Sequence, residues 1–508
     1  MENQIAPGAP SPQGPSNKFL AFTGSSAHFF GMVCLGASLL LSACGGGGGG
    51  SPNDLVVTST KLLPASQLAN KCVTPDPLKE AKGTVDDEKA WVRSFVDERY
   101  LWYKDVPNLD PKNYASAELY FNDLKTPKLN SAGTPLDRYH WSETNAQAQA
   151  WQTGVYLDYG IEWQTIKSSP PRNWLVLNVE PLSPAGVAGV RRGDQLISVD
   201  GVDFVAGTDT NTINSGLNPG DSTAHTFVLR RAGTNVTISL SAGASYETTP
   251  VRNKQIFNYQ GKKIAYLYFD SFIIKSQEPL VEAFQFFADQ KVDELVLDMR
   301  YNGGGLLYQS AQLAYMVAGD KSLGKLYTQN IYNDKRQSET DDSKVEFVHQ
   351  QIDWAQLTYT SQLPTLNLNR VTMLVSYNTA SASEALVNGL RGIDVEVNLI
   401  GKNTYGKPYG FVPTSNCGRT YYAVEFRGAN AKGFSDFDGG FAPTCVASDD
   451  LTHALGDPAE TMLASAIYYV NNRKCSVSAA SRLAAIQAPE PTNSLPRPRM
   501  VLTPMRRP

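Results

Sequence analysis

The chain has 508 residues, enough for two or three domains, because single hydrophobic cores stop growing well below that length. Lysine and arginine number 45 against 49 aspartate and glutamate residues, which gives a formal net charge of −4. No long basic stripe occurs, so the electrostatic footprint of a nucleic-acid-binding protein is missing. The composition otherwise fits an ordinary globular protein and excludes nucleic acid as an expected partner.

A short apolar segment, FFGMVCLGASLLLSA, occupies residues 29–43. It has the length of a signal-peptide core and is too short to span a bilayer comfortably. It runs into the sequence LSAC followed by six glycines, which resembles the lipobox of bacterial lipoproteins. The resemblance implies cleavage after Ala43 and a diacylglycerol on Cys44, which would anchor an exported protein to a lipid bilayer. Gly45, where aspartate would signal retention, favours the outer membrane. The alternatives are a plain secretory signal and a buried apolar helix.

Four cysteines remain once the two in the N-terminal segment are set aside. An even number in an oxidising compartment favours disulfides, and four cysteines allow three connectivities. Cys417 with Cys445, both in one loop-rich segment, is the preferred pair, and Cys72 with Cys475 would then tie the ends of the folded part together. Four unpaired buried thiols are the alternative. No cysteine or histidine spacing predicts a metal site.

The chain divides into segments of different pattern. After the expected signal peptide, 1–43, residues 44–80 lack periodicity and are predicted to be a lipidated cysteine and a flexible linker. Apolar residues at helical spacing predict an amphipathic helix over 86–103, within a mostly helical N-terminal domain, 81–150, that caps another domain. The tail, 476–508, is rich in proline and arginine and is predicted to be disordered.

Residues 151–245 are typical of a small β-rich domain, with short apolar runs broken by glycine and proline. Strands are expected at 173–179, 195–199, 225–230 and 236–240. Between the first two lies SPAGVAGVRRGDQLISVDG, which resembles the signature of PDZ domains. The resemblance implies that a C-terminal carboxylate binds near Tyr159, Gly160 and Ile161, while the extended peptide adds to the sheet edge. Any small β-barrel with a helix is the alternative.

From residue 246 to 475, strand and helix signals alternate. Strands are expected at 264–269, 294–299, 371–375 and 395–400. Repeated β-α-β units predict an α/β domain with mostly parallel strands. Residues 320–365 are polar and irregular, and are predicted to be an insertion or a lid.

One serine follows the strand at 371–375 at the start of a predicted helix, in the run TASASE over 379–384. Backbone N–H groups in the first turn of a helix lack internal acceptors, and the helix dipole adds positive charge there. Such groups stabilise the oxyanion of acyl transfer, which makes Ser381 a candidate nucleophile. An ordinary helix cap is the commoner role for a serine at this position.

A serine nucleophile needs a base, because its free hydroxyl reacts poorly near neutral pH. None of the four histidines beyond the signal lies in a motif that suggests a Ser-His-Asp triad. Lys407, in the turn TYGKPYG, is the candidate instead, because burial lowers the pKa of a lysine and keeps its amine neutral. Lys402 is a competing candidate, and a surface lysine in a turn is the alternative.

Together these motifs resemble those of the carboxyl-terminal processing, or tail-specific, peptidases. The resemblance covers residues 150–470 and includes the PDZ-like signature, the serine run, the lysine turn and a glycine run. It implies a multidomain α/β protein with a helical N-terminal cap, a β-rich PDZ domain and an α/β peptidase domain of crotonase-like βαβ units. It implies no metal and no organic cofactor.

The resemblance also implies a Ser/Lys dyad, with Ser381 as the nucleophile and Lys407 as the general base. Many members of the family carry a glutamine four residues after the lysine, where this chain has Phe411. Either another group orients Lys407, or the activity is weakened.

The glycine run DMRYNGGG, residues 298–305, is the third chemical motif of the resemblance. It implies that a glycine N–H joins the Ala382 N–H in an oxyanion hole. Gly304 is preferred for this role, although Gly303 or Gly305 would fit nearly as well.

The leading hypothesis is a serine endopeptidase that captures the C-terminal tail of an exported protein or peptide and cleaves it as an extended strand. The second is a catalytically weak or inactive peptide-binding lipoprotein that keeps the same domains. A crotonase-like acyl hydrolase is the third, and the PDZ-like segment argues against it. Nothing in the sequence indicates an oligomeric state.

Overall fold

The structure, a computed structural model, describes residues 62–130, 133–243 and 245–476. The predicted signal peptide, Cys44 and the tail from residue 477 lie outside the described residues. Residues 352–360 belong to a small separate unit, and the other described residues from 63 onward form the larger one. None of the helices in the described ranges combines the length and the apolar character needed to cross a bilayer.

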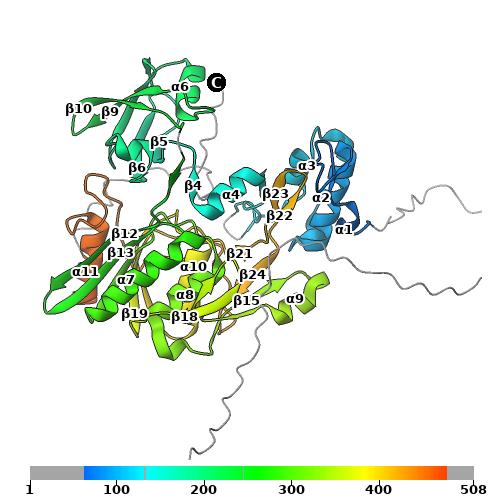
Figure 1. The fold of residues 1–508 in the computed structure, drawn as a ribbon. Helices are drawn as coiled ribbons and strands as arrows, with labels where there is room; N and C mark the ends of the chain where they lie inside the picture. The colour runs from blue at the N-terminus through cyan, green and yellow to red at the C-terminus, as the bar shows by residue number, and fades with distance from the viewer. Residues whose placement is uncertain (1–61, 131–132, 244, 477–508) are drawn as a thin grey trace, which may run out of the picture. The chain divides into compact units, whose positions relative to one another are not determined.

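A six-stranded sheet forms the core of the larger unit, in the order β12-β13-β14-β19-β20-β25 (Figure 1). The strands span Val251–Tyr259, Lys262–Phe269, Glu294–Asp298, Arg370–Val375, Glu396–Gly401 and Cys445–Val446. The five strands from β13 to β25 in this order run parallel to one another, and β12 is an antiparallel edge strand. The central strands are nearly continuous buried runs, as expected for a parallel sheet that is covered on both faces. The predicted α/β class is confirmed.

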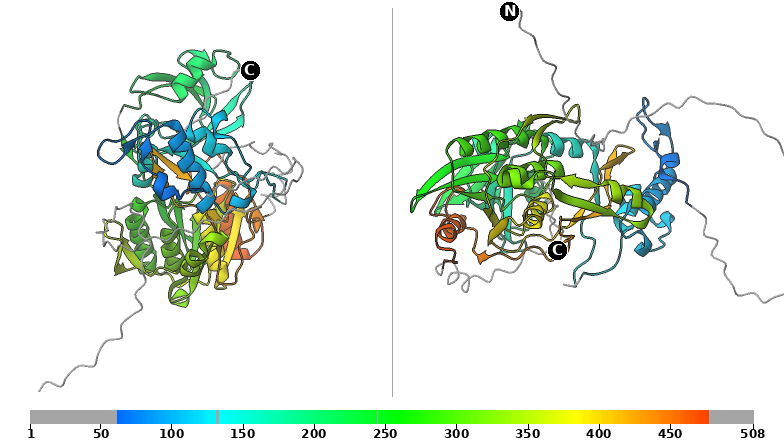
Figure 2. Two further views of the ribbon diagram at one scale, coloured as in Figure 1. Left: turned by 90° about the vertical axis from the view of Figure 1, so that its right-hand side faces the viewer. Right: turned by 90° about the horizontal axis from the view of Figure 1, so that it is seen from below.

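Helices cover both faces of this sheet. They are α7 (Gln277–Asp289), α8 (Leu307–Ala318), α10 (Ala382–Gly392) and α11 (Thr461–Asn472). Alternate side chains of β13, namely Ile264, Tyr266 and Tyr268, pack in one cluster with α11. Helix α10 packs against α8, and Figure 2 shows α7 and α8 on the side of the sheet opposite α11.

The N-terminal part is helical, as predicted. Its helices are α1 (Ala65–Leu68), α2 (Val85–Arg99), α3 (Ala117–Asp123) and α4 (Asn145–Thr153). Helix α2 begins with a capping box between Thr84 and Asp87, and it buries Trp91 and Phe95. The same cluster includes Tyr421 from the C-terminal part of the chain.

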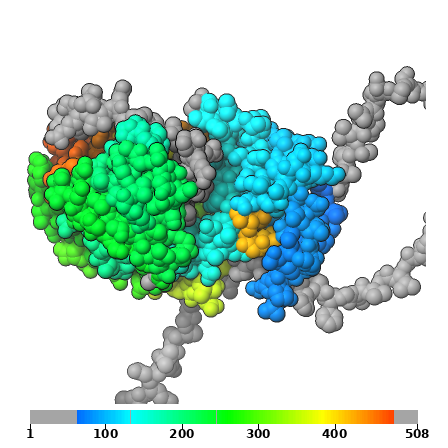
Figure 3. Space-filling view, turned by 90° about the horizontal axis from the view of Figure 1, so that it is seen from above, coloured from blue at the N-terminus to red at the C-terminus, as the bar shows by residue number. Residues whose placement is uncertain are grey.

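A three-stranded sheet joins the N-terminal part to a hairpin far along the chain. Strand β3 (Trp141–Thr144) pairs with β23 (Arg419–Tyr422), which pairs with β22 (Thr414–Asn416). In Figure 3 the orange surface of this hairpin is bordered by the blue and cyan N-terminal segments. The N-terminal part is therefore built into the C-terminal part by backbone pairing as well as by side-chain packing.

A second large sheet has the order β10-β9-β7-β6-β5, with β8 paired to β7. The strands β5 to β10 span Ile161–Lys167, Asn173–Val179, Gln195–Val199, Val202–Asp203, His225–Arg231 and Thr234–Leu240. The helices α5 (Pro184–Val187) and α6 (Thr210–Leu217) belong to this part. All four predicted strands are present. Strand β5 and helix α6 were not predicted, because their polar residues interrupt the regular spacing of apolar residues.

The segment predicted to be irregular, 320–365, contains regular structure instead. It holds β15 (Leu326–Tyr332), α9 (Gln337–Asp342), β16 (Lys344–Glu346), β17 (Gln350–Asp353) and β18 (Thr358–Gln362). Strand β15 lies in a four-stranded sheet with β16, β24 (Phe426–Ala429) and β21 (Tyr409–Gly410). The prediction was wrong because buried polar groups satisfy each other: the Asn330 N–H donates to Ser343 Oγ, and that hydroxyl donates back to the Asn330 carbonyl.

Short elements complete the described chain. The two-residue strands β1 (Lys71–Cys72), β2 (Ala81–Lys82), β4 (Val155–Tyr156) and β11 (Tyr246–Glu247) pair as β1-β2 and β4-β11. Short 3₁₀ turns occur at Tyr103–Asp105, Pro111–Asn113, Ile274–Ser276, Gly319–Ser322 and Asp334–Arg336.

Two disulfides are present, and they connect Cys72 with Cys417 and Cys445 with Cys475, with Cα–Cα distances of 5.2 and 5.4 Å. The predicted pairing was wrong. Cys417 occupies the turn of the β22–β23 hairpin beside the N-terminal part, whereas Cys445 lies on β25, before α11, and its partner Cys475 follows that helix. Cys417 and Cys445 therefore belong to different sheets, although they are close in sequence.

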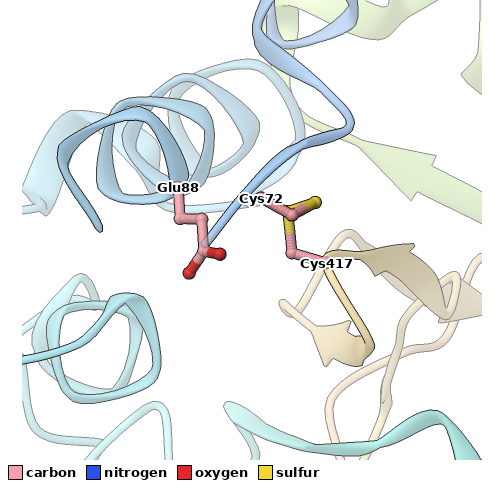
Figure 4. A group of neighbouring side chains, drawn as sticks. All are labelled: Cys72, Glu88 and Cys417. Atoms are coloured by element: carbon pink, nitrogen blue, oxygen red, sulfur yellow. A yellow bond between two sulfur atoms is a disulfide. The ribbon is translucent and has the colours of Figure 1, made fainter. Parts of the chain in front are cut away.

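The carboxylate of Glu88 lies beside the first disulfide (Figure 4). It accepts a hydrogen bond of 2.8 Å from the Val73 N–H. The sulfur atoms of Cys72 and Cys417 are bonded to each other, and only a free thiolate is an effective metal ligand. The carboxylate therefore orders the chain around Cys72, and the predicted linker to residue 80 is too long, since α1 and β1 are already fixed here.

We expect a proteolytic map of the unreduced protein to contain linked peptides for Cys72 with Cys417 and for Cys445 with Cys475. The first link joins positions 345 residues apart and the second 30 residues apart. Because loop-closure entropy grows with loop length, replacing the first pair by serine should lower the free energy of unfolding by about 2 kcal/mol more than replacing the second. A peptide linking Cys417 to Cys445 would contradict the pairing.

Candidate active site

Ser381 stands between β19 and α10, at the N-cap position of that helix. Its backbone has φ 58° and ψ −116°, a conformation that residues other than glycine rarely adopt. Such strain persists only where the surroundings enforce it, and it is concentrated at functional sites. Here the Ser381 N–H donates to Glu384 Oε2 at 3.0 Å, and the preceding Ala380 N–H donates to the Asn302 carbonyl at 3.1 Å. Ser381 is therefore both the helix cap and a strained residue.

The glycine run lies directly against this turn. A side chain at Gly304, which has φ 106°, would place its Cβ 2.8 Å from Ser381 Cβ and 2.9 Å from the Ala382 nitrogen. Only glycine permits that approach. The side chain of Asn302 organises the contact, because its Oδ1 accepts hydrogen bonds from the Gly304 N–H and the Ser383 hydroxyl, both 2.9 Å long.

The candidate oxyanion donors differ in what they now bind. The Ala382 N–H has no acceptor among the residues that the structure describes, and the same is true of the Gly303 N–H. The Gly304 N–H is engaged by Asn302 Oδ1. An oxyanion that used Gly304 would have to replace that side chain, whereas one that used Ala382 would meet a free donor.

Lys407 follows β20 in a turn whose glycine is also required. Gly406 has φ 84°, and a Cβ there would lie 2.2 Å from the Asp438 carbonyl oxygen. The Lys407 side chain points into a group of aromatic rings, with Nζ 4.1 Å from the centre of Phe411. Burial lowers the pKa of Lys407 to about 7, against the opposing charges of Glu384 and Asp137. A large share of the amine is therefore neutral near pH 7, whereas Lys402 is exposed.

The carboxylate of Glu384 joins the two predicted catalytic segments. It is fully buried and accepts four hydrogen bonds. Oε2 accepts the backbone N–H groups of Ser381 and Lys407, at 3.0 and 2.8 Å. Oε1 accepts the Thr404 hydroxyl and the Gly406 N–H, at 2.6 and 2.7 Å. Burial raises the pKa of Glu384, and these four donors oppose that rise.

The structure thus brings Ser381, Ala382, Gly304 and Lys407 to one place. No hydrogen bond joins Ser381 Oγ to Lys407 Nζ in the described part of the chain, although catalytic contacts are often loose without substrate. No role for Glu384 was predicted from the sequence. Its position three residues after a helix-capping serine is the spacing of a capping box, which was the available signal.

The residues predicted to bind a peptide carboxylate lie on the second sheet. The buried Tyr159 packs its ring on Phe227, with centroids 5.4 Å apart. The Gly160 N–H donates to Asp158 Oδ1 at 2.7 Å. Ile161 begins β5, which is one of the two edge strands of that sheet. The edge is suited to an added strand, but the Gly160 N–H is occupied.

Comparison with protein families gives two matches. Residues 263–416 match the model of Peptidase family S41, and residues 87–142 match that of the Peptidase S41 N-terminal domain. The first range contains both Ser381 and Lys407. The predicted resemblance to this class of peptidases is confirmed for these two ranges.

Curated relatives are processing enzymes. The carboxyl-terminal-processing protease of Synechocystis sp. is 24% identical over 285 residues, which cover 55% of this chain and 59% of the relative. The chloroplastic carboxyl-terminal-processing peptidase 1 of Arabidopsis thaliana is 25% identical over 232 residues, which cover 44% of this chain and 42% of the relative. The matched regions thus span about half the length of these relatives.

A solved structure shares the fold. The crystal structure of a putative S41 protease from Bacteroides fragilis superposes with a TM-score of 0.59 at 23% identity, over 76% of this chain and 97% of that one. This likeness shows that the arrangement of helices and strands is shared.

We expect Glu384→Gln to destabilise the protein. The amide nitrogen would face backbone N–H groups that now donate to a carboxylate oxygen, so some buried donors would lose their acceptor. We expect this to lower the free energy of unfolding by about 2–4 kcal/mol. Urea denaturation measures the loss. Glu282→Gln, at an exposed position on α7, is the matched control and should change stability by less than about 0.5 kcal/mol. Equal stability of the two variants would contradict a bridging role for Glu384.

Proposed function

We propose that the chain, which matches the model of Peptidase family S41 over residues 263–416, is a serine endopeptidase in which Ser381 attacks the peptide and Lys407 is the general base. The observation that carries the proposal is the bridge made by Glu384. One buried carboxylate oxygen accepts the backbone N–H groups of both residues. The nucleophile and the base are thus held on either side of a single acceptor.

The chemistry follows from these positions. Neutral Lys407 takes the hydroxyl proton as Ser381 Oγ bonds to the substrate carbonyl carbon, and the carbonyl electrons move onto its oxygen. The Ala382 N–H stabilises this oxyanion, assisted by Gly304 once that group leaves Asn302. The oxyanion then reforms the carbonyl, the C–N bond breaks, and the Lys407 ammonium returns a proton to the leaving amine. Water cleaves the resulting ester by the same steps, with Lys407 again the base.

The second sheet is proposed to act as a PDZ domain that captures the substrate tail. Support comes from the signature at 183–201 and from the edge position of β5. An extended peptide adding to β5 would gain backbone hydrogen bonds without disturbing the core. Its carboxylate would have to displace Asp158 from the Gly160 N–H, or use the neighbouring N–H groups of the loop.

The protein is proposed to be exported and anchored to the outer membrane through Cys44. The lipobox-like sequence supports the anchor. The two disulfides support the location, because structural disulfides persist in oxidising compartments and are rare in the cytosol. Its substrates would then be other exported proteins or peptides.

A second candidate function is peptide binding without turnover. The observation that favours it is the position of the Lys407 amine, which contacts the Phe411 ring and is not hydrogen-bonded to Ser381 in the described structure. The pKa of Lys407 favours catalysis, because an amine kept only to bind peptide has no need to be neutral.

We expect Ser381→Ala and Lys407→Ala each to reduce kcat by about 10³-fold or more. The substrate is an unstructured peptide, and the masses of its products report cleavage directly. Lys402→Ala, which changes an exposed lysine of the same segment, is the control and should keep full activity. The same assay with the C-terminus amidated should show a raised KM if the second sheet captures a carboxylate. Full turnover by Ser381→Ala or Lys407→Ala would refute the dyad.

We expect kcat/KM to fall about tenfold for each pH unit below pH 7 and to level off above it. Lowering the pH protonates Lys407, whose pKa is lowered to about 7, and the ammonium has no lone pair with which to accept the serine proton. Lys407→Arg should be inactive throughout, because a guanidinium stays charged at every accessible pH. An acid limb centred near pH 4 would assign the base to a carboxylate instead.

A further inference from the structure

We propose that Tyr139, Trp141 and Phe411 are positioning residues that hold the Lys407 amine in reach of Ser381. The inference rests on the proposed function and concerns what keeps the base in place. These three residues are called the aromatic cage below.

The cage surrounds the amine on several sides. Lys407 Nζ lies 4.1 Å from the ring centre of Phe411, 5.6 Å from that of Tyr139 and 5.7 Å from that of Trp141. All three distances fall within the range in which an ammonium is attracted to an aromatic face. Tyr139 and Trp141 come from the N-terminal part, while Phe411 directly follows β21. The base is thus enclosed by segments that are far apart in the sequence.

The rings are themselves fixed. Trp141 stacks on Tyr422, its partner across the β3–β23 pair, with centroids 4.0 Å apart and planes 3° apart. Phe411 meets both of these rings edge-on, with centroids 4.8 and 5.2 Å away. These rings therefore form a rigid packing surface for the lysine side chain, because no ring can rotate without losing a stacked or edge contact.

Tyr139 is fixed from both ends. Its hydroxyl donates to the carbonyl of Gly406, the residue just before Lys407. Its backbone N–H donates to Asp137 Oδ1 at 2.9 Å, and Asp137 Oδ2 in turn accepts the hydroxyl of Tyr100. The cage is therefore anchored to the lysine turn on one side and to the N-terminal helices on the other.

Apart from the electrostatic attraction of Glu384 and Asp137, no group in the described chain other than the rings acts on the amine. Lys407 Nζ makes no hydrogen bond and no ion pair with any residue that the structure describes. A lysine has four rotatable bonds, and an unrestrained amine would spread over many rotamers. The rings restrict those rotamers without offering an acceptor that would compete for the proton. This explains how a base can be oriented although position 411 carries no hydrogen-bonding side chain.

The test compares two substitutions at one position. Phe411→Leu keeps an apolar side chain but removes the ring, and Phe411→Tyr keeps the ring. We expect kcat to fall about tenfold in Phe411→Leu, with KM changed less than about twofold, and to stay near the wild-type value in Phe411→Tyr. Phe286→Leu, on α7, is the matched control, because it removes another aromatic ring that lies beside a lysine. The ring centre of Phe286 is 4.7 Å from Lys254 Nζ, and its loss should leave kcat unchanged.

A spectroscopic measurement gives a readout that does not depend on turnover. In protein labelled with ¹³C-lysine, the Cε–Hε signals of Lys407 are identified by their absence from Lys407→Ala. Ring currents should shift them upfield of the other lysines, and Phe411→Leu should return them toward ordinary positions. Unshifted signals in the wild-type protein would overturn the cage.

The kinetic outcomes separate this inference from the dyad. If Lys407→Ala is inactive while Phe411→Leu has wild-type kcat, the dyad stands and the cage is overturned. A rise of kcat in Phe411→Leu also overturns it, because the rings would then hold the amine away from Ser381. Equal losses in Phe411→Leu and Phe411→Tyr overturn it as well, since the ring would not be the cause. Activity in Lys407→Ala refutes the proposed function itself.

Discussion

The buried carboxylate of Glu384 sets the relation between the two halves of the candidate site. A carboxylate removed from water is costly, and the cost is offset only when donors surround it. Four donors do so here, and they come from two loops: Ser381 on one side, and Thr404, Gly406 and Lys407 on the other. Moving either loop would leave a buried charge without part of its donors. The strained backbone of Ser381 is therefore maintained by the same interaction that fixes the start of the lysine turn.

The order of the strands explains why these loops meet at all. Strands β14, β19 and β20 are parallel neighbours, so their carboxyl ends lie along one edge of the sheet. The loop after β14 carries Asn302 and Gly304, the loop after β19 carries Ser381, and the loop after β20 carries Lys407. Adjacent carboxyl ends of parallel strands are where α/β folds place ligands. Asn302 then joins the first two loops, and Glu384 joins the last two.

Short motifs and apolar runs were sufficient to predict the features that depend on local sequence. The buried strands were predicted because both faces of a parallel sheet demand continuous apolar sequence, and Ser381 and Lys407 were proposed from motifs at strand ends. Disulfides and strand pairs between segments far apart in the sequence leave no such local pattern. The partner of Cys417 depends on the hairpin it caps, and Trp141 meets Tyr422 only because β3 pairs with β23. Buried polar partners such as Asn330 and Ser343 made a real strand resemble a loop.

The N-terminal part therefore does more than cover a neighbouring domain. Strand β3 lines the lysine with Trp141 and pairs with β23, whose Tyr422 supports that ring. The same hairpin is held at its turn by the Cys72–Cys417 disulfide, which comes from the N-terminal part as well. A hairpin pinned at its tip and paired along its side has little freedom to twist, so the stack of rings behind Lys407 keeps its shape. The covalent link and the placement of the Lys407 side chain are thus two consequences of one arrangement, and structural disulfides of this kind persist in oxidising compartments.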